Sequence, residues 1–519
     1  MTYLAVPIAA KNIAEVQTRT LAAKSSCADI IELRTDYLEG LTLDLAAQAI
    51  IAVRAAGLPI IVTCRDKAQG GAGDHSLELR SDILAAAINA GADHIDCEYE
   101  NFKIPEVRKK IALALLAAPL TKLILSAHNF DGPWPAGKLA DMYDEIVDDF
   151  PAAIPKLVYT ANHINDTFAA FDLLENKITD AIVLCMSDAG MISRIIAKKL
   201  GAYLTFASLD DAAATAPGQI TASRMKDLYR FDSIDADTDL YGVIGSPIGH
   251  SMSPNIFNAC FADKSINAVF MHLLVDGDEK DFTEFMDNIT EREYLDFCGF
   301  SVTLPHKAHA VEYVEKKGET LEPLAAEIGA VNTIKIGYGE LVGGYNTDCH
   351  GAIDALTSVL NIKKHALHSV NVAVIGAGGV SRAVVAGLCD LGAHVTVYNR
   401  TVEKAKGLAA EFGCKYASIE DVARMDASVV VNCTSIGMYP DVDSAPVPEG
   451  CFKPDMAVFD TVYNPLQTKM LAMAQAVGAK TVNGAEMFIR QAVAQFKIFT
   501  TKEPNEQIMR ETVFTKLAN

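Results

Sequence analysis

The sequence predicts an α/β protein whose N-terminal half is a (β/α)8 barrel and whose C-terminal half contains a Rossmann dinucleotide-binding domain. Three observations support this fold class. Short β-rich runs alternate with helical segments through the first half, a short acidic stretch interrupts that pattern at 231–240, and a strand, a glycine-rich turn and a helix follow from residue 371. A chain of 519 residues is also long enough for two or three domains.

Composition narrows the class of protein. The formal net charge of −21, with no basic block, argues against a nucleic-acid partner. The 11 cysteines contain no C-x-x-C pair, so reduced thiols in a cytoplasmic protein are expected and no metal site is predicted. The N-terminus lacks a signal or transit pattern, and the most apolar run, 111–127, is interrupted by Pro119 and Lys122, so no membrane association is expected. The partners should be small molecules. The sequence leaves the oligomeric state open, a monomer included.

Eight β-rich runs define the predicted barrel, and helical spacing of apolar residues separates them. The runs are LAVPI (4–8), DIIELR (29–34), PIIVTCR (59–65), DHIDCE (93–98), KLILSAH (122–128), IPKLVYT (154–160), AIVLCM (181–186) and AYLTFAS (202–208). Eight parallel units in roughly 200–250 residues match a closed barrel better than the alternative, an open eight-stranded sheet.

Polar residues gather where these strands should end, which is the face that carries chemistry in such barrels. The candidates are Glu32, Arg34, Arg65, His128 and Arg194. Each alone could be a surface charge, but together the three arginines predict an anionic substrate. His128 could exchange a proton near neutral pH.

Lys156 stands inside an apolar strand, where its side chain could simply extend to solvent. The alternative is that a desolvated amine is needed there as a nucleophile, since only a neutral amine attacks a carbonyl. Burial and the neighbouring cations should both disfavour its protonation.

The predicted nucleotide-binding turn follows the strand NVAVIG. Gly376, Ala377, Gly378 and Gly379 would let a pyrophosphate approach the helix N-terminus, although Ser381 replaces the third fingerprint glycine. The next strand ends without the acidic residue of NAD enzymes and carries Asn399, Arg400, Thr401 and Lys404 instead. Because Arg400 and Lys404 suit a 2′-phosphate, NADP(H) is predicted over NAD.

Three polar motifs precede that turn: YGVIGSPIGHSMSP, GFSVTLPHK, and the pair GAVNTI and GYNTD. Taken singly, serines near Pro254 form turns and Lys307 is a solvated lysine.

The first half resembles the type I 3-dehydroquinate dehydratases through IELRTD, TCR…QGG, SAHNF, IPKLVYTA, MISR and TAPGQ. The resemblance covers residues 1–232 and implies that Lys156 forms a Schiff base and His128 is the acid/base. It also implies which residues bind the substrate carboxylate and hydroxyls: Glu32, Arg34, Arg65, Arg194, Thr215 and Gln219. The chain departs from the family pattern at Gln69, usually glutamate, and at Thr215, usually serine.

The second half resembles the shikimate dehydrogenases, and the likeness continues through NCTSIGM, DTVYNP and NGAEMFIRQAVAQF. It implies a catalytic pair, Lys307 and Asp348, and adds Thr434 to the cofactor residues. The implied substrate residues are Ser251, Ser253, Thr303, Asn332, Tyr463, Gln491 and Gln495. The substrate domain would span 239–350, completed by 481–519, with the Rossmann NADP-binding domain at 351–480.

The two resemblances together predict consecutive reactions in one chain, in which the product of the first site is the substrate of the second. Two rival hypotheses remain. A quinate/shikimate dehydrogenase with a different main substrate would be distinguished by the relative turnover of the two acids. A non-catalytic metabolite sensor would need none of Lys156, His128, Lys307 and Asp348.

Overall fold

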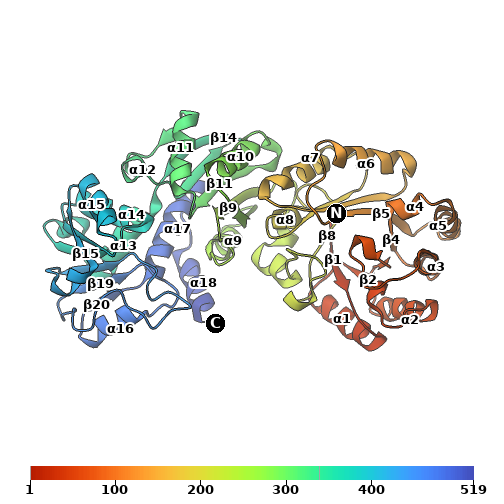
Figure 1. Ribbon diagram of the computed structural model, residues 1–519, viewed down its shortest axis with the longest axis horizontal. Coiled ribbons are helices and arrows are strands. Elements are labelled where there is room, and N and C mark those ends of the chain that lie inside the picture. Colours follow the sequence, from red (N-terminus) through yellow and green to blue (C-terminus); the bar gives the residue numbers. More distant parts are fainter. Residues whose placement is uncertain (1, 338, 519) are drawn as a thin grey trace. The chain divides into compact units, whose positions relative to one another are not determined.

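The computed structural model describes residues 2–337 and 339–518 and divides the chain into two compact units (Figure 1). Unit 1 comprises Met1–Thr238 with Leu273–Asp276, and unit 2 comprises Asp239–His272 with Gly277–Asn519.

Unit 1 is a nearly closed barrel of eight parallel strands, as predicted. The strands are β1 (Tyr3–Ile8), β2 (Ile30–Arg34), β3 (Ile60–Thr63), β4 (His94–Glu98), β5 (Lys122–Asn129), β6 (Ile154–Thr160), β7 (Ile182–Met186) and β8 (Leu204–Phe206). Hydrogen bonding connects them in the order β7-β6-β5-β4-β3-β2-β1-β8. A backbone hydrogen bond of 2.8 Å from Tyr203 to Ala181, just before β8 and β7, helps to bring the two ends together.

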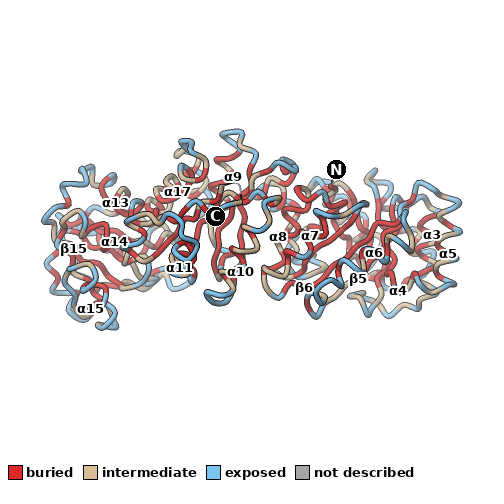
Figure 2. The backbone as a smooth tube through the Cα atoms, turned by 90° about the horizontal axis from the view of Figure 1, so that it is seen from above, coloured by how far each residue is buried: buried red, intermediate tan, exposed pale blue. Residues whose placement is uncertain are grey.

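The helices of unit 1 surround these strands. They are α1 (Ile13–Ser25), α2 (Leu43–Arg54), α3 (Leu77–Asn89), α4 (Tyr99–Phe102), α5 (Pro105–Ala117), α6 (Lys138–Asp149), α7 (Phe168–Asn176) and α8 (Met191–Ile195). Asn12, Thr42 and Ser76 cap α1, α2 and α3 by accepting backbone N–H bonds, which explains where these helices begin. The strands are buried on both faces, whereas the outer turns are exposed (Figure 2).

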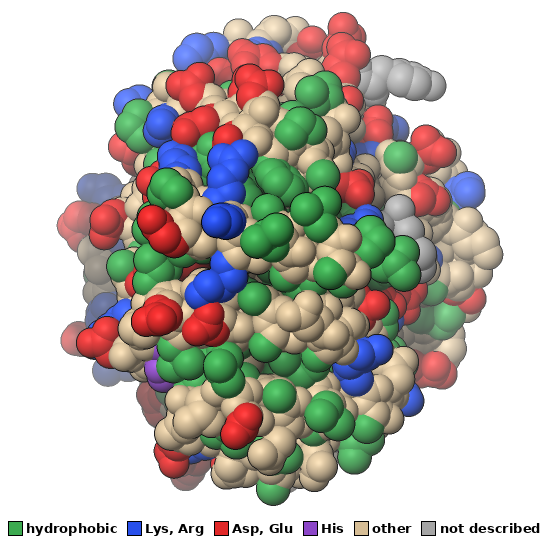
Figure 3. Space-filling view, turned by 90° about the vertical axis from the view of Figure 1, so that its right-hand side faces the viewer, with side chains coloured by type: hydrophobic (Ala, Val, Ile, Leu, Met, Phe, Trp, Pro, Cys, Tyr) green, Lys and Arg blue, Asp and Glu red, His purple; other side chains and the backbone are tan. Residues whose placement is uncertain are grey.

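The outer face of unit 1 that carries α3, α4 and α5 shows hydrophobic side chains among charged ones (Figure 3). Leu113 and Leu116 on α5, and Leu120 just after it, are 58%, 79% and 93% exposed. This stripe is apolar surface that the fold of unit 1 leaves uncovered.

The acidic stretch at the junction is anchored to unit 1 by buried side chains and hydrogen bonds. Phe231 and Ile234 are buried, and the ammonium groups of Lys198 and Lys199 donate to backbone carbonyls between residues 231 and 236. The two buried side chains and the lysine hydrogen bonds together attach the segment to unit 1.

Unit 2 begins with a mixed sheet in the order β10-β9-β11-β13-β14-β12. Its strands are β9 (Asp239–Gly245), β10 (Ala268–Leu274), β11 (Phe297–Val302), β12 (Thr320–Leu321), β13 (Thr333–Gly337) and β14 (Glu340–Tyr345). The associated helices are α9 (Ser253–Asp263), α10 (Glu279–Thr290), α11 (Lys307–Lys317) and α12 (Pro323–Ile328).

A second sheet follows, with six parallel strands in the Rossmann order β17-β16-β15-β18-β19-β20. The strands are β15 (Asn371–Ile375), β16 (His394–Asn399), β17 (Lys415–Ser418), β18 (Val429–Asn432), β19 (Ala457–Asp460) and β20 (Lys480–Val482). Their helices are α13 (Thr347–Leu360), α14 (Gly379–Asp390), α15 (Val402–Glu411) and α16 (Lys469–Ala476).

The chain then returns to the first sheet of unit 2 through α17 (Gly484–Thr500) and α18 (Glu506–Ala518). Phe499 of α17 lies with its ring centroid 5.4 Å from Tyr241 of β9 and 5.9 Å from Phe257 of α9. Within the described part of the chain, no helix combines the length and the apolar character needed to cross a membrane.

Two candidate active sites

The C-terminal ends of the barrel strands surround a cavity. All eight residues that the sequence places in the first site line it: Glu32, Arg34, Arg65, His128, Lys156, Arg194, Thr215 and Gln219. Gln69, Phe130, Met186 and Phe206 complete much of its wall. Residues separated by up to 187 positions in the chain therefore share one concave surface.

Lys156 points into this cavity from β6 and is only 4% exposed. Its ammonium nitrogen lies 2.8 Å from Asp96 Oδ2 and 3.4 Å from Glu32 Oε1, above the ring of Phe206. The amine is buried as predicted, but its direct neighbours are carboxylates rather than the expected cations. The lysine is therefore held as one member of an ion-pair network.

Two of the three predicted substrate arginines already have partners inside unit 1. Arg34 pairs with Asp36 at 2.8 Å, and Arg65 pairs with Asp96 at 2.8 Å and Glu98 at 2.9 Å. Their positive charge is thus partly offset within the fold, and their contact with the substrate stays a prediction.

Arg194 is different because its guanidinium pairs with no carboxylate among the described residues. The residue is 2% exposed, and its Nε has no hydrogen-bond partner among residues 2–337 and 339–518. Burial lowers the pKa of Arg194 to about 10. A buried cation without a counter-ion is costly, so this position in the cavity favours an anionic ligand.

His128 is held by Gln69. The Gln69 Oε1 atom accepts from the His128 backbone N–H at 3.1 Å and lies 3.1 Å from His128 Nδ1. Because the backbone N–H can only donate, Oε1 is the acceptor, and Nδ1 must carry the ring proton. The other ring nitrogen, Nε2, then keeps its lone pair and can act as a base.

The charge state of His128 follows from its surroundings. Burial, together with the positive charges of Arg65 and Lys156, holds the pKa of His128 well below its ordinary value. The imidazole is therefore neutral at pH 7, as a general base requires.

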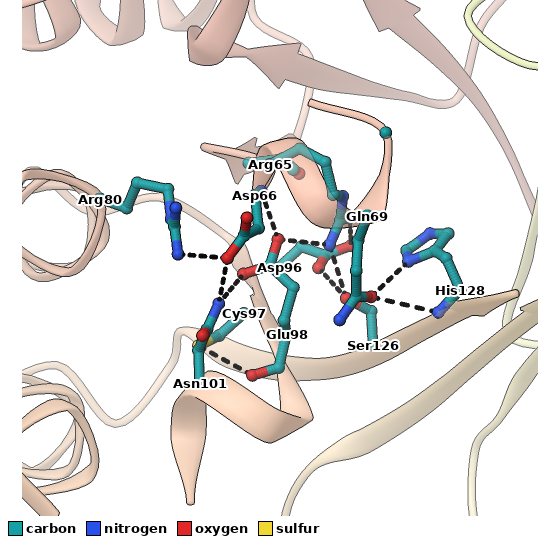
Figure 4. Close-up of polar contacts among 12 residues, drawn as sticks. Arg65, Asp66, Gln69, Arg80, Asp96, Cys97, Glu98, Asn101, Ser126 and His128 are labelled. Atoms are coloured by element: carbon teal, nitrogen blue, oxygen red, sulfur yellow. Dashed lines mark hydrogen bonds and ion pairs between the residues drawn. The ribbon is translucent and has the colours of Figure 1, made fainter. Parts of the chain in front are cut away.

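Figure 4 shows a polar network behind these residues that the sequence analysis missed. Ser126 donates to Asp96 at 2.6 Å and accepts from Arg65 at 2.7 Å, and Glu98 accepts from both Arg65 and the Asp66 backbone. A signal was present in DHIDCE, where Asp96 and Glu98 alternate along a strand that should be apolar. Alternation places both on the same face of β4, toward the barrel interior.

The second cavity lies in unit 2. All nine substrate and catalytic residues predicted there line it: Ser251, Ser253, Thr303, Lys307, Asn332, Asp348, Tyr463, Gln491 and Gln495. Lys307, at the start of α11, donates to Asp348 of α13 at 2.5 Å. The two side chains are 16% and 13% exposed, so the pair is partly desolvated but accessible from the cavity.

Hydrogen bonds orient the neutral residues of this cavity. Ser251 donates to Ser253 at 3.2 Å, and Asn332 is fixed by Thr347, which donates its backbone N–H to the Asn332 amide oxygen at 2.8 Å. Gln495 accepts from Ser301 and donates to Thr333 and to the Asn332 carbonyl. Its amide is therefore engaged in supporting the cavity wall.

The predicted cofactor residues meet at the C-terminal edge of the Rossmann sheet. Gly376 follows β15 with φ 109°, and a Cβ there would lie 3.0 Å from Thr434 Cγ2. A Cβ at Gly378 or Gly379 would meet no protein atom within 4 Å, so this side of the turn is open to a ligand. Asn399 ends the adjacent β16, and Arg400, Thr401 and Lys404 are exposed beyond it.

The fold and the cavities together define a two-site enzyme, a lysine-containing barrel joined to a dinucleotide-dependent oxidoreductase. Residues 4–236 match the family model for type I 3-dehydroquinase, and 243–334 match the shikimate dehydrogenase substrate binding domain. Residues 358–439 match shikimate / quinate 5-dehydrogenase, and 484–514 match the shikimate 5'-dehydrogenase C-terminal domain.

Known relatives agree with these matches. The chain is 36% identical over 515 residues to the bifunctional 3-dehydroquinate dehydratase/shikimate dehydrogenase, chloroplastic, of Arabidopsis thaliana, covering 96% of this chain and 82% of the relative. It is 38% identical over 295 residues to the shikimate dehydrogenase (NADP(+)) of Methanocaldococcus jannaschii, covering 55% of this chain and 99% of that one. A crystal structure of a shikimate dehydrogenase in complex with NADP+ superposes with a TM-score of 0.50 at 37% identity, covering 55% and 98%. The chain belongs to the family of bifunctional 3-dehydroquinate dehydratase/shikimate dehydrogenases.

Proposed function

We propose that unit 1 dehydrates 3-dehydroquinate to 3-dehydroshikimate through a Schiff base on Lys156. The observation that carries this proposal is the presence of three groups in one cavity: a buried amine, a neutral imidazole and a guanidinium whose Nε has no hydrogen-bond partner among the described residues. Arg194 binds the substrate carboxylate, which places the ketone of the same molecule against Lys156. Thr215 and Gln219 contact the substrate hydroxyls. A 2.8 Å hydrogen bond from Thr215 N to Gln219 Oε1 joins the two residues.

The reaction requires proton transfers that these side chains can perform. Lys156 attacks the ketone carbon as the free amine, and two of the three protons of its ammonium group leave with the ketone oxygen as water, which gives a protonated imine. Nε2 of His128 then removes the proton from the adjacent carbon and passes it to the substrate hydroxyl, which leaves as water, and hydrolysis of the imine releases the product and restores Lys156. Asp96 and Glu32 stabilise the positive charge on the imine nitrogen from the positions they hold beside the ammonium.

We propose that unit 2 reduces 3-dehydroshikimate to shikimate with NADPH. Lys307 can donate a proton to the developing alkoxide, and the Asp348 carboxylate holds the ammonium in place and passes it a replacement proton from solvent. Ser251 and Ser253 bind the carboxylate, while Thr303, Asn332, Tyr463 and Gln491 contact the rest of the substrate.

The residues around the Rossmann edge fit a nicotinamide dinucleotide with a 2′-phosphate. The open side of Gly378 and Gly379 admits a pyrophosphate at the start of α14, and Asn399, Arg400, Thr401 and Lys404 offer donors and positive charge one strand away. The cofactor supplies the hydride when it is bound. Gln495 supports the substrate pocket from behind.

The test is a coupled assay with the full chain alone. Addition of 3-dehydroquinate and NADPH should yield shikimate, and the reverse reaction should turn over shikimate faster than quinate. Borohydride added with 3-dehydroquinate should leave a stable adduct on the peptide that contains Lys156. An adduct elsewhere, or no consumption of NADPH, would overturn the assignment.

Two lysine variants sharpen this test. Lys156→Ala should lose dehydration and the adduct but keep the reduction of 3-dehydroshikimate. Lys122→Ala removes a half-exposed lysine from the opposite end of the neighbouring strand and should retain both.

A further inference from the structure

Two buried side chains of unit 2, Asn432 and Asp460, lie behind the cavity without lining it. They are the last residues of the adjacent parallel strands β18 and β19 and stand opposite each other in register. Both are 0% exposed, and Asn432 Nδ2 donates to Asp460 Oδ1 at 2.9 Å. They therefore join two strand ends at the edge of a Rossmann sheet where ligands bind.

Asn432 also holds the loop on the cofactor side. Its amide oxygen accepts from the backbone N–H of Thr434 at 3.0 Å and from the Thr434 hydroxyl at 2.7 Å. Its amide nitrogen also donates to the Ile436 carbonyl at 3.3 Å. Thr434 packs against Gly376, so this loop forms one wall of the nucleotide-binding turn.

Asp460 holds the loop on the substrate side at both ends. Its carboxylate accepts from Val462 N at 3.0 Å and from the Thr468 hydroxyl at 2.6 Å. Tyr463 lies between these two hydrogen-bonded positions in the chain, and Thr461 lies just before them. Both residues line the substrate cavity. The Val462 carbonyl in turn accepts from Gly484 N, at the start of the helix that carries Gln491.

The carboxylate of Asp460 is an unusual choice for such a buried position. Its hydrogen-bond partners are three uncharged donors, and no cation within residues 2–337 and 339–518 pairs with it. Burial raises the pKa of Asp460 to about 6. The nearby Cys433 thiol is titratable, but burial raises its pKa, so it stays neutral. An unpaired buried carboxylate destabilises a fold, which suggests that its acceptor geometry has another use.

We propose that Asn432 and Asp460 form one brace that fixes the cofactor loop and the substrate loop relative to each other, which makes Asp460 a positioning residue for hydride transfer. Hydride transfer needs the two ligands in a narrow range of separations, and a displacement of about 1 Å can reduce turnover roughly 100-fold. The inference rests on the proposed dehydrogenase function of this cavity.

The unaltered chain is assayed first, because a lack of NADPH-dependent reduction would overturn the proposed function and the brace together. Asp460→Ala removes all three acceptor bonds. Its turnover number should fall about 10- to 100-fold, while the separate dissociation constants for NADP+ and shikimate change by less than about threefold. In Asp460→Asn, the amide oxygen can still accept hydrogen bonds from Asn432 and Val462, and the amide nitrogen can donate to the Thr468 hydroxyl oxygen. This variant should therefore recover most of the turnover.

Asn432→Asp distinguishes a brace from general stability and decides the question if Asp460→Ala does not fold. It places a second carboxylate of the same shape against Asp460, and the pair can keep its hydrogen bond only while it shares a proton. Dehydrogenase turnover of this variant should therefore fall with rising pH, whereas its dehydratase profile should match that of the unaltered chain. Unchanged turnover in folded Asp460→Ala, or a dehydrogenase profile in Asn432→Asp parallel to that of the unaltered chain, would overturn the brace.

Discussion

At the scale of single residues, the hydrogen bond from His128 to Gln69 sets the behaviour of the barrel site. The amide oxygen fixes the ring tautomer just as a carboxylate would, because both accept the Nδ1 proton. It brings no negative charge, however, so nothing at position 69 offsets the burial and the cations that lower the pKa of His128. The orientation of the base is retained while its basicity is reduced.

Gln69→Glu should raise the pKa of His128, since a carboxylate beside the ring favours the imidazolium. His128 acts as a base only when it is neutral, so the acidic limb of the dehydratase profile should move to higher pH, by up to about one unit. The pH dependence of dehydratase kcat/KM measures this. Gln48→Glu, which adds the same charge at an exposed site on α2, should leave the limb in place. A limb that stays fixed in Gln69→Glu would show that position 69 has no electrostatic effect on the ring.

Arg400→Ala should weaken NADPH binding selectively, because a charge-assisted bond to the 2′-phosphate is lost and NADH has no such group. The KM for NADPH should rise about 10- to 100-fold and that for NADH about twofold or less. The matched control is Lys415→Ala. It removes an exposed cation at the start of β17, so at the end of the sheet opposite to the C-terminal strand ends where Arg400 lies. Equal changes for both cofactors would place the phosphate elsewhere.

Which residues enter the sites could be predicted from strand ends and motifs, and the resemblance also predicted the pair of Lys307 and Asp348. How the charged residues of the barrel pair could not be predicted. Arg65 follows a strand as expected, yet its partner Asp96 lies 31 residues further along the chain. Local patterns give no information on whether such a carboxylate will reach the guanidinium. For the same reason the sequence did not single out Arg194, which alone among the three candidate arginines pairs with no carboxylate in the described part of the chain.

At the scale of secondary-structure elements, β4 carries polar side chains into the barrel at both of its ends. Asp96 and Glu98 lie toward the C-terminal end of the strand, near the cavity. His94 lies at its start, and this residue is 6% exposed. The His94 Nε2 atom lies 2.6 Å from the Tyr203 hydroxyl, and its Nδ1 has no partner among the described residues. Burial lowers the pKa of His94 to about 4.

His94 should make unit 1 sensitive to acid. The unfolded chain takes up a proton near the ordinary pKa of about 6.5 and the folded chain only near 4, so the free energy of unfolding falls as the pH drops through that window. The loss should reach about 2 kcal/mol by pH 5. The single tryptophan, Trp134, packs against Tyr159 in unit 1, so its fluorescence during urea unfolding at pH 7 and pH 5 measures this unit alone.

Two variants separate titration from packing. His94→Phe should reduce the difference between the two pH values, because the titrating ring is gone. Tyr203→Phe removes the hydroxyl partner but keeps the imidazole, so it should lower stability at both pH values and retain most of the difference. If the decrease in the free energy of unfolding between pH 7 and pH 5 is unchanged in His94→Phe, another group causes the effect.

The elements themselves were well predicted because their signals are local. The barrel strands are buried on both faces and are mostly apolar, so each appears as an apolar-rich run even where a polar side chain enters the barrel, and each begins after a turn or a helix end. The burial of Phe231 and Ile234 in the junction could not be predicted, since two apolar residues among acidic ones do not form a pattern. The domain limits 1–232, 239–350 with 481–519, and 351–480 stay a prediction.

At the scale of the whole molecule, each cavity is built from one unit only. The barrel cavity is lined by residues between 32 and 219, and the second cavity by residues between 243 and 495. Neither set contains a residue of the other unit. The chemistry at each site can therefore proceed without a side chain from its neighbour in the chain.

Two inactive chains should therefore complement each other in solution. Lys156→Ala lacks the first reaction, and Lys307→Met replaces the proposed proton donor of the second with an apolar side chain of similar length. With 3-dehydroquinate and NADPH, Lys156→Ala alone should form no shikimate, and Lys307→Met alone should accumulate 3-dehydroshikimate. An equimolar mixture should form shikimate after a lag, because the intermediate must leave one chain, reach a useful concentration and bind another. The lag should shorten as the concentration of Lys156→Ala is raised at a fixed concentration of Lys307→Met. If each variant keeps its own partial reaction but the mixture makes no shikimate, the two sites depend on being joined, and the independence inferred from the separate cavities is wrong.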